Sequence, residues 1–285
     1  MTYSTNGPRK KKVDCNNCRA RIDGLCTGAS SNTLLDIARS RMGDREIMAG
    51  QDLFTLGEPN ETIYNLVSGW VFRYQLLEDG RRQILDFALP GAVLGFHPIA
   101  RSLTTFGAQT LTDCVVCAIP YSALGPLSRE HPELGLRLAW LMSRDRSLAY
   151  DHLTNIGRRS ARKRVAHLLL ELFVRYRAQW PGFRIEEMHL PLTQEHIGDA
   201  TGLTSVHVNR VLRDLRRDGV VEFHYRRLQI LDPDKLVSEA EMDPQLALSW
   251  LRQASPKAEA GKRQDPPIAP PSCSDVAESR RRAYA

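Results

Sequence analysis

Short apolar runs separated by glycine turns fill residues 47–120 of the chain. The runs with the composition of β-strands are 62–67, 71–76, 83–88 and 114–119. Many short strands at this spacing are typical of an antiparallel barrel or jelly roll. The first part of the chain is therefore predicted to form a β-domain.

After residue 131 the pattern changes to that of one long helix, predicted over 132–155. Two apolar seams run along it: Leu134, Leu138, Leu141 and Leu148, and beside them Met142, Ala149, Leu153 and Ile156. A helix that needs burial on two sides commonly packs on its own domain and on a second copy of itself. We therefore expect a homodimer, with a core helix that has no partner as the alternative. Asp145 and Arg146 interrupt the seams, either as charges that meet across a two-fold axis or as a solvated face.

Beyond a further helix predicted over 160–178, residues 193–217 indicate two short helices that Gly202 separates by a sharp turn. Thr193 and Thr204 lie where each short helix needs an N-cap. The second helix carries an aliphatic stripe and an opposite stripe rich in arginine. The first stripe is Val208, Val211, Leu212 and Leu215, and the second is Val206, Arg210, Arg213 and Arg217. Because the aliphatic stripe must be buried, the arginines face outward, as in a helix-turn-helix whose second helix enters a DNA major groove. The alternative is a solvated basic face.

Two short β-type runs, 220–224 and 228–231, follow this helix pair. The turn between them is Tyr225-Arg226-Arg227, which is basic. This pattern predicts a wing whose tip contacts phosphate, and it strengthens the interpretation as a DNA-binding domain.

Length and charge set the wider limits. A chain of 285 residues can form two domains with separate cores. Its net charge of +6 favours a polyanionic partner such as DNA. The sequence contains no apolar run long enough to span a membrane and no secretory signal, so we expect a cytoplasmic protein. In that reducing compartment the six cysteines are expected to be ligands or free thiols rather than disulfides.

The cysteines have a notable spacing. Cys15, Cys18 and Cys26 form a Cys-x2-Cys-x7-Cys group near the N-terminus, and Cys114 and Cys117 lie in the last predicted strand of the β-domain. Residues three apart on a regular strand point to opposite faces, so only one of the latter pair can meet the N-terminal group. Small core side chains and a zinc site are the alternative interpretations.

A barrel, a long helix and a winged helix-turn-helix in this order resemble the Crp/Fnr family of bacterial transcription regulators, over roughly residues 15–235. Residues 89–96, LPGAVLGF, look like the barrel motif of that family, and the run from Ile197-Gly198 through Gly202-Leu203-Thr204 to Asn209-Arg210 looks like its helix-turn-helix. The resemblance implies an α+β fold and a homodimer that binds palindromic double-stranded DNA, with RNA polymerase as a further partner. The expected division is a cysteine-bearing segment (1–30), a β jelly-roll sensor domain (31–130), a dimerisation helix (131–157), a winged helix-turn-helix (158–240) and a disordered tail (241–285).

Members of the family that bind cyclic AMP carry a glutamate after the Leu-Pro-Gly motif and an Arg-Ser pair before the next strand. This sequence has Phe96 and Thr104-Thr105 at those positions, which leaves a cyclic phosphate without an arginine. The upstream pair Arg101-Ser102 could replace it only through a different loop length. Cyclic-nucleotide sensing is thus an alternative, as is a haem-bound gas.

The cysteines instead resemble the oxygen-sensing Fnr branch, in which three N-terminal cysteines and one barrel cysteine hold a [4Fe–4S] cluster. Carried over to this sequence, the ligands are Cys15, Cys18, Cys26 and Cys117, because the Val-Cys-x-Ile-Pro pattern matches at Cys117 rather than Cys114. Leu25 would form an apolar shield beside the iron. The gap of seven residues before Cys26 is two residues longer than in the best-known member. The implied mechanism is a redox switch in which oxygen destroys the cluster, dimer pairing weakens and DNA is released.

The resemblance also implies what the recognition helix reads. The base-reading positions, usually Glu and Arg, correspond to Val206 and Arg210. Arginine pairs with guanine O6 and N7, whereas valine cannot accept a hydrogen bond from cytosine N4. The residues expected at the DNA are Ser205, Val206, Asn209, Arg210, Arg213 and Arg217. We expect no enzyme: the motifs GxxxxGK[ST], GxSxG and HExxH do not occur, and Cys15-x-x-Cys18 lacks the βαβ context of a thiol redox pair.

Overall fold

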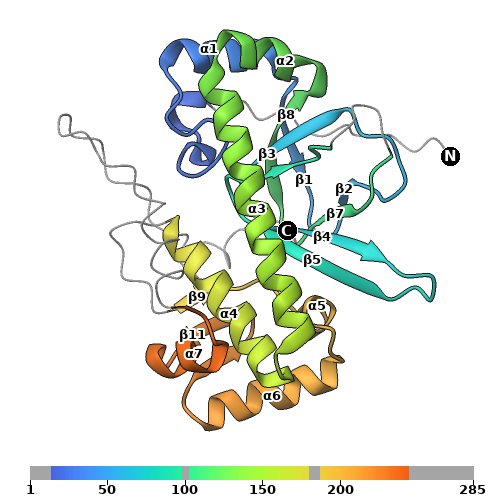
Figure 1. Ribbon diagram of the computed structural model, residues 1–285, viewed down its shortest axis with the longest axis vertical. Helices are drawn as coiled ribbons and strands as arrows, with labels where there is room; N and C mark the ends of the chain where they lie inside the picture. The colour runs from blue at the N-terminus through green and yellow to red at the C-terminus, as the bar shows by residue number, and fades with distance from the viewer. Residues whose placement is uncertain (1–13, 98–102, 180–186, 244–285) are drawn as a thin grey trace, which may run out of the picture.

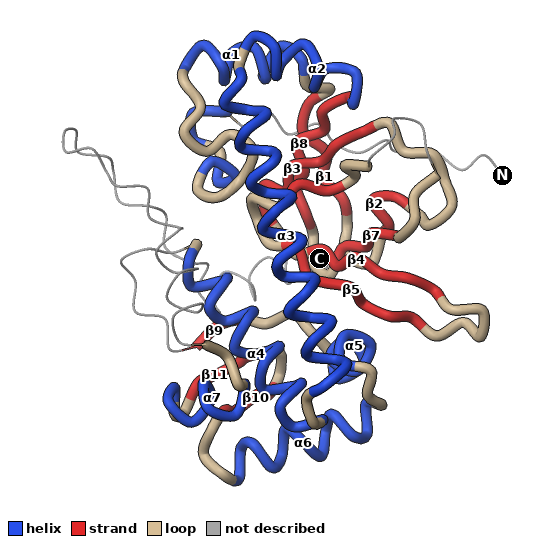
Figure 2. The backbone as a smooth tube through the Cα atoms, viewed as in Figure 1, coloured by secondary structure: helices blue, strands red, loops and turns tan. Residues whose placement is uncertain are grey.

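The structure is a computed structural model that describes residues 14–97, 103–179 and 187–243. Figures 1 and 2 show a β-domain and a smaller C-terminal domain connected by one long helix, α3. None of the described helices is long and apolar enough to cross a membrane. The predicted tail from residue 244 onward and the pair Arg101-Ser102 lie outside the described residues.

The β-domain consists of two four-stranded antiparallel sheets, which confirms the jelly-roll prediction. The first has the order β1 (Gly43–Ile47), β8 (Cys114–Pro120), β3 (Thr62–Ser68) and β6 (Val93–Leu94). The second has the order β2 (Asp52–Phe54), β7 (Gly107–Thr110), β4 (Val71–Leu76) and β5 (Arg82–Ala88). The four strands named from the sequence are present within one residue at each end. The shorter β1, β2, β6 and β7 had too few apolar residues to stand out.

Two short 3-10 turns, η1 (Cys15–Asn17) and η2 (Arg19–Arg21), and helix α1 (Ser31–Ser40) precede the barrel. Helix α2 (Tyr121–Glu130) follows it and leads into α3 (Pro132–Arg158). The Ser30 hydroxyl accepts a hydrogen bond from the Thr33 amide at 3.1 Å and so caps α1. Pro132 begins α3 at a position where a missing backbone N–H costs nothing. The predicted long helix is therefore present and continues three residues further.

The C-terminal domain surrounds helix α4 (Ala161–Ala178). The remaining elements are β9 (Glu187–His189), α5 (Gln194–Thr201), α6 (Ser205–Arg217), β10 (Val221–His224), β11 (Arg227–Ile230) and α7 (Pro233–Ala240). The strands form an antiparallel sheet in the order β10-β11-β9. This is a winged helix-turn-helix, as the sequence predicts; β9 and α7 were not foreseen.

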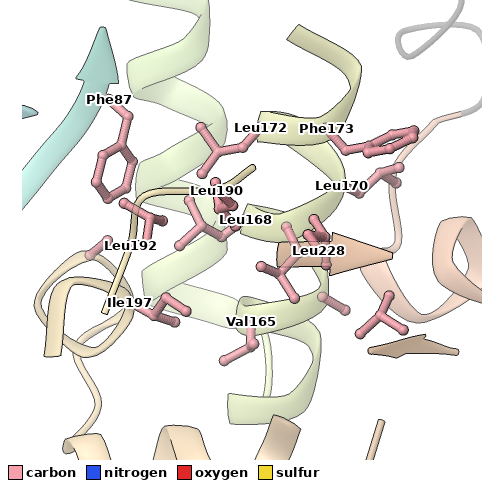
Figure 3. Close-up of a cluster of buried hydrophobic side chains, with 14 of the residues drawn as sticks. Phe87, Val165, Leu168, Leu170, Leu172, Phe173, Leu190, Leu192, Ile197 and Leu228 are labelled. Carbon is pink, nitrogen blue, oxygen red and sulfur yellow. The ribbon is translucent and has the colours of Figure 1, made fainter. Parts of the chain in front are cut away.

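One apolar cluster joins the two domains. Figure 3 shows Phe87 of β5 in one cluster of buried side chains with Leu172 of α4 and Ile197 of α5. Polar contacts reinforce this junction, because Arg82 of β5 pairs with Asp199 of α5 at 2.8 Å. The helix-turn-helix is therefore packed directly on the barrel.

The structure changes the picture of the α3 seams. Leu134 and Leu141 of the first predicted seam are buried within their own protomer. Asp145 also turns inward, where it pairs with Arg73 of β4 at 2.9 Å in the same chain rather than lying on a solvated face. The exposed large apolar side chains of α3 are Leu136 (75%), Tyr150 (63%) and Leu153 (69%). Together with Ala139, Ser143 and Arg146 they form a stripe with the three-and-four spacing of a coiled-coil seam.

Candidate functional site

Two glycines form the tight turn of the helix-turn-helix. Gly202 ends α5 in the left-handed region with a φ of 68°. A Cβ on Gly198 would lie only 2.5 Å from the carbonyl oxygen of Leu203, so the two helices approach too closely there for any side chain. Thr193 and Thr204 cap α5 and α6 by accepting hydrogen bonds from backbone amides three residues on. The turn predicted at Gly202 is thus present with both caps.

Helix α6 has two distinct faces. Val208, Val211, Leu212 and Leu215 are buried, as expected from their stripe. Ser205, Val206, Arg210, Arg213 and Arg217 are exposed, and Val206 has 71% of its surface accessible. In Figure 1 this helix lies at the end of the molecule farthest from α1. A basic face on an outer helix is available to a large ligand.

The arginines of this face differ in their partners. Among the described residues, neither Arg210 nor Arg213 forms an ion pair with a carboxylate. Arg217 is bound to Asp214 at 2.8 Å and to Asp218 at 3.1 Å. Part of the charge of Arg217 is thus neutralised locally, whereas the other two arginines keep theirs for an anionic ligand.

Asn209 is half-buried, and its side-chain amide donates to Gln194 Oε1 at 3.1 Å. Gln194 is the first residue of α5. Sequence reasoning did not single it out, because a lone glutamine has no distinctive pattern. The contact ties the start of α5 to the middle of α6 and fixes the angle at which α6 is presented.

The wing is a two-residue hairpin. Tyr225 and Arg226 both have positive φ, 49° and 61°, as a type I′ turn requires. The turn was predicted to include Arg227, but that residue belongs to β11 and pairs with Glu187 of β9. Tyr225 and Arg226 therefore form the exposed tip by themselves.

The structure brings Cys15, Cys18, Cys26 and Cys117 into one hydrophobic cluster at the first sheet. Cys26 and Cys117 are buried, and Cys15 and Cys18 are half-buried. Cys117 lies opposite Asp44 in the pairing of β8 with β1. Leu25 is buried in the same cluster. Ligand-type residues more than ninety positions apart in the sequence are thus neighbours.

Cys114 points away from this group. It lies in the cluster between the two sheets, and its thiol contacts the carbonyl oxygens of Trp70 and Thr112 at 3.4 and 3.2 Å. The opposite orientations of Cys114 and Cys117 follow from the alternation of side chains along a strand.

Burial makes these thiols hard to ionise. Burial, together with the smaller effect of the neighbouring Cys117, Cys18 and Cys15, raises the pKa of Cys26 to about 12. The pKa of Cys117 rises to about 11 for the same main reason, although Arg41 opposes the shift. Four mutually close thiolates are therefore unfavourable unless a cation compensates their charge.

Arg41 provides one positive group in this cluster. Its guanidinium donates to Asp44 at 2.7 Å and to the Cys117 sulfur at 3.7 Å. Asp44 is fully buried. Sequence reasoning missed both residues, because an Arg and an Asp three positions apart look like an ordinary surface pair.

The four thiols fit an iron–sulfur cluster in kind and number, since such clusters take four thiolates. In the described part of the chain, no three of the four sulfurs lie within 4.8 Å of one another. A tetrahedral zinc site holds its sulfurs about 3.8 Å apart, given Zn–S bonds near 2.3 Å. Among the described residues, the group of ligand atoms that lie within 4.8 Å of one another is Asp36, Glu130 and His131, not the cysteines.

At two positions where this sequence differs from cyclic-nucleotide binders, Phe96 and Thr104, the side chains have packing or hydrogen-bonding roles within the barrel. Phe96 stacks on Tyr121 with ring centres 5.7 Å apart. Thr104 is buried, and its hydroxyl donates to the Thr55 carbonyl. In β4 and β5, Arg73 and Arg82 are bound to aspartates rather than directed at an open site.

Comparisons with known proteins agree with this architecture. Residues 44–131 match the family model of the cyclic nucleotide-binding domain, and residues 163–239 match that of the Crp-like helix-turn-helix domain. The nitrogen fixation regulation protein FixK of Bradyrhizobium diazoefficiens is 31% identical over 78% of this chain and 92% of its own length. The transcriptional activator protein FnrA of Stutzerimonas stutzeri is 27% identical over 81% and 95%. The structure of FixK2 from Bradyrhizobium japonicum matches with a TM-score of 0.63 and 29% identity, over 70% of this chain and 98% of that one.

Proposed function

Because this chain belongs to the Crp/Fnr family of DNA-binding transcription regulators, we propose that it is a homodimeric member that senses oxygen through a [4Fe–4S] cluster. The observation that carries the proposal is the gathering of four thiols from two distant segments into one largely buried group. FnrA, which is similar along 95% of its length, is named a transcriptional activator, which is consistent with a regulator but leaves the signal open.

The proposed ligands are Cys15, Cys18, Cys26 and Cys117. When bound, the cluster would supply iron cations that stabilise the four thiolates and a centre that reacts with oxygen. The buried Leu25 limits access of water to that centre. Arg41 holds the Cys117 sulfur by a charged hydrogen bond, which favours its thiolate form.

The dimer is proposed to form along α3. Its exposed stripe, Leu136, Ala139, Ser143, Arg146, Tyr150 and Leu153, has heptad spacing and is apolar or small except at Arg146. A second copy of the same helix is the partner that matches this spacing. Two parallel Arg146 side chains near the axis would weaken the pair, which makes dimerisation easy to modulate.

In the DNA complex, Arg210 is proposed to read guanine in each half-site, and Arg213 and Arg217 to contact phosphates. Val206 would contact a thymine methyl group. Ser205 lies on the same exposed face, and Asn209 is proposed to contribute mainly through its bond to Gln194. RNA polymerase is the expected partner of the bound dimer.

The chain itself then provides the switch. While the thiols are held together, residues 15–26 remain bound to the barrel and to α3. Once they are no longer held, the buried thiols revert to the protonated form that their raised pKa values favour. The N-terminal segment then loses its anchor, α3 loses a packing surface, and the two recognition helices no longer share a fixed spacing.

The test is DNA binding by anaerobically purified protein before and after exposure to air, measured by fluorescence anisotropy on a palindromic site. We expect tight binding without oxygen and a loss on exposure, together with loss of iron and sulfide. Binding that is insensitive to air, or that requires added cyclic AMP, would contradict the proposal. The variant Cys114→Ser is the control, since the Cys114 side chain lies in the apolar cluster between the two sheets, away from the four thiols.

A further inference from the structure

Asp23 connects the cysteine segment with α3. Its two carboxylate oxygens bind two different arginines of that helix: Oδ1 accepts from Arg137 Nη2 at 3.1 Å, and Oδ2 accepts from Arg144 Nη1 at 2.5 Å. All three side chains are at least two-thirds buried. Arg137 and Arg144 lie two helical turns apart on one face, so a single carboxylate bridges them.

Further contacts fix the geometry of this bridge. Arg137 Nε donates to the carbonyl oxygen of Gly24 at 2.9 Å, next to Asp23 in the chain. Trp140 lies between the two arginines, with its ring centre 4.2 Å from the Arg137 guanidinium and 5.3 Å from that of Arg144. Such contacts stabilise a cation and restrict its direction. The positions of both arginines are therefore fixed by several contacts in addition to the ion pairs with Asp23.

The backbone beside the bridge also has no space to move. A Cβ on Gly24 would lie 2.3 Å from the carbonyl oxygen of Ala20 and 3.0 Å from Gly91 of the barrel. Gly91 itself has a φ of 95°, and a Cβ there would lie 3.0 Å from Asp23. The turn at residues 23–24 is therefore held between the barrel on one side and α3 on the other.

The position of Asp23 in the sequence indicates what the bridge connects. It lies within the seven-residue gap between Cys18 and Cys26. The arginines that bind it are on the helix whose other face carries the exposed stripe with Leu136 and Leu153. In Figure 1 the N-terminal segment lies beside the upper half of α3. One residue thus touches both the candidate sensor and the candidate dimer helix.

We propose that Asp23, with Arg137 and Arg144, is a positioning contact that couples the cysteine segment to the pairing of α3. The proposal rests on the proposed function for its biological role. While residues 18–26 are held in place, the single charge of Asp23 offsets part of the repulsion between two neighbouring cations and fixes the first half of α3. When the segment leaves, Arg137 and Arg144 both lose the Asp23 carboxylate, although Arg144 keeps its longer contact with Asp145 at 3.8 Å. That part of the helix then loses its restraint.

The experiment uses the full-length protein, purified without oxygen, with the variant Asp23→Asn. The amide keeps the size of the side chain but removes the charge that the two arginines need. We expect iron and sulfide to remain near the wild-type level while the dimer dissociation constant, measured by sedimentation, rises about 5- to 150-fold, the range of ordinary coupling free energies. Asp23→Glu should recover part of the loss.

Asp79→Asn is the matched control, because Asp79 is an exposed aspartate bound to Arg81 in the turn between β4 and β5. It should leave the dimer unchanged. A wild-type dissociation constant in Asp23→Asn would overturn the coupling, whether or not its iron content changes.

A second readout separates this proposal from the proposed function. Hydrogen exchange of residues 19–27 and of the first half of α3 should increase in Asp23→Asn relative to wild type in the protein as purified. If the wild type contains no iron, the oxygen-sensing proposal fails. The exchange and sedimentation results still decide whether Asp23 couples the segment to α3, and unchanged exchange in both regions would refute it.

Discussion

The readout at Arg210 yields the most specific prediction for DNA recognition. Arg210 is exposed on α6 and, within the described part of the chain, has no carboxylate to compete with a base. A bidentate arginine–guanine pair contributes about 1 to 3 kcal/mol of discrimination. Arg210→Ala should therefore reduce the preference for guanine about 5- to 150-fold in each half-site. Because a dimer reads two half-sites, a palindromic substitution loses this preference twice.

The assay is a binding selection from a library randomised at every position of a palindromic site, followed by competition measurements at several salt concentrations. Arg213→Ala is the matched control, since Arg213 has the same charge and exposure one turn further along α6. It should weaken binding to all sequences alike and lower the salt slope by about 1 for each phosphate that the side chain no longer neutralises. Val206→Glu should add a preference for cytosine, because a carboxylate accepts from N4. If Arg210→Ala leaves the selected site unchanged, the assigned orientation of α6 is wrong.

Three further predictions concern stability. Gly198→Ala should destabilise the C-terminal domain by about 1 to 3 kcal/mol in thermal unfolding, through overpacking against the next turn. The control is Gly157→Ala, because a Cβ at Gly157 meets nothing within 4 Å. This variant should be neutral or stabilising in the same assay. Arg41→Met removes the guanidinium that pairs with the buried Asp44 and should lower the free energy of unfolding by about 3 to 5 kcal/mol in urea unfolding. A double variant that also carries Asp44→Asn should recover much of this stability. No recovery would argue against the pair. The half-buried Asp86 has a pKa below the ordinary value of about 3.9, because its guanidinium partner Arg73 outweighs the effect of burial. Its contribution is therefore present above that pH and lost as the pH falls through the lowered pKa, so the stability gap between wild type and Asp86→Asn should shrink from pH 5 to pH 2; a constant gap would contradict the assignment.

The fold was largely readable from the sequence because its main signals are local. The glycine-punctuated strands, the uninterrupted stretch after residue 131 and the two-faced pattern of α6 each depend on residues close together in the chain. The caps at Thr193 and Thr204 and the turn at Gly202 belong to the same class. Elements with weak local patterns, such as β9 with three residues, were not predictable in this way.

Contacts between distant charges were not readable. Asp145 looks like a seam residue on a helical wheel, but its partner Arg73 lies 72 positions earlier in the chain. Asp23 is likewise one polar residue among many in its segment, and only the fold places it against α3. Sequence periodicity gives the face of a helix, but the neighbour on that face depends on tertiary packing.

The cysteine site lies between these two cases. The spacing of Cys15, Cys18 and Cys26 is visible in the sequence, and strand alternation separates Cys114 from Cys117. Arg41, which donates to the Cys117 sulfur, had no signal in the sequence.

The most direct test of the oxygen-sensing account is the iron and acid-labile sulfide content of the protein purified without oxygen, compared with Cys117→Ser and Cys114→Ser. The account predicts about four of each per chain in the wild type, a large loss in Cys117→Ser and no loss in Cys114→Ser. Zinc in place of iron, no metal, or equal losses in the two variants would contradict it.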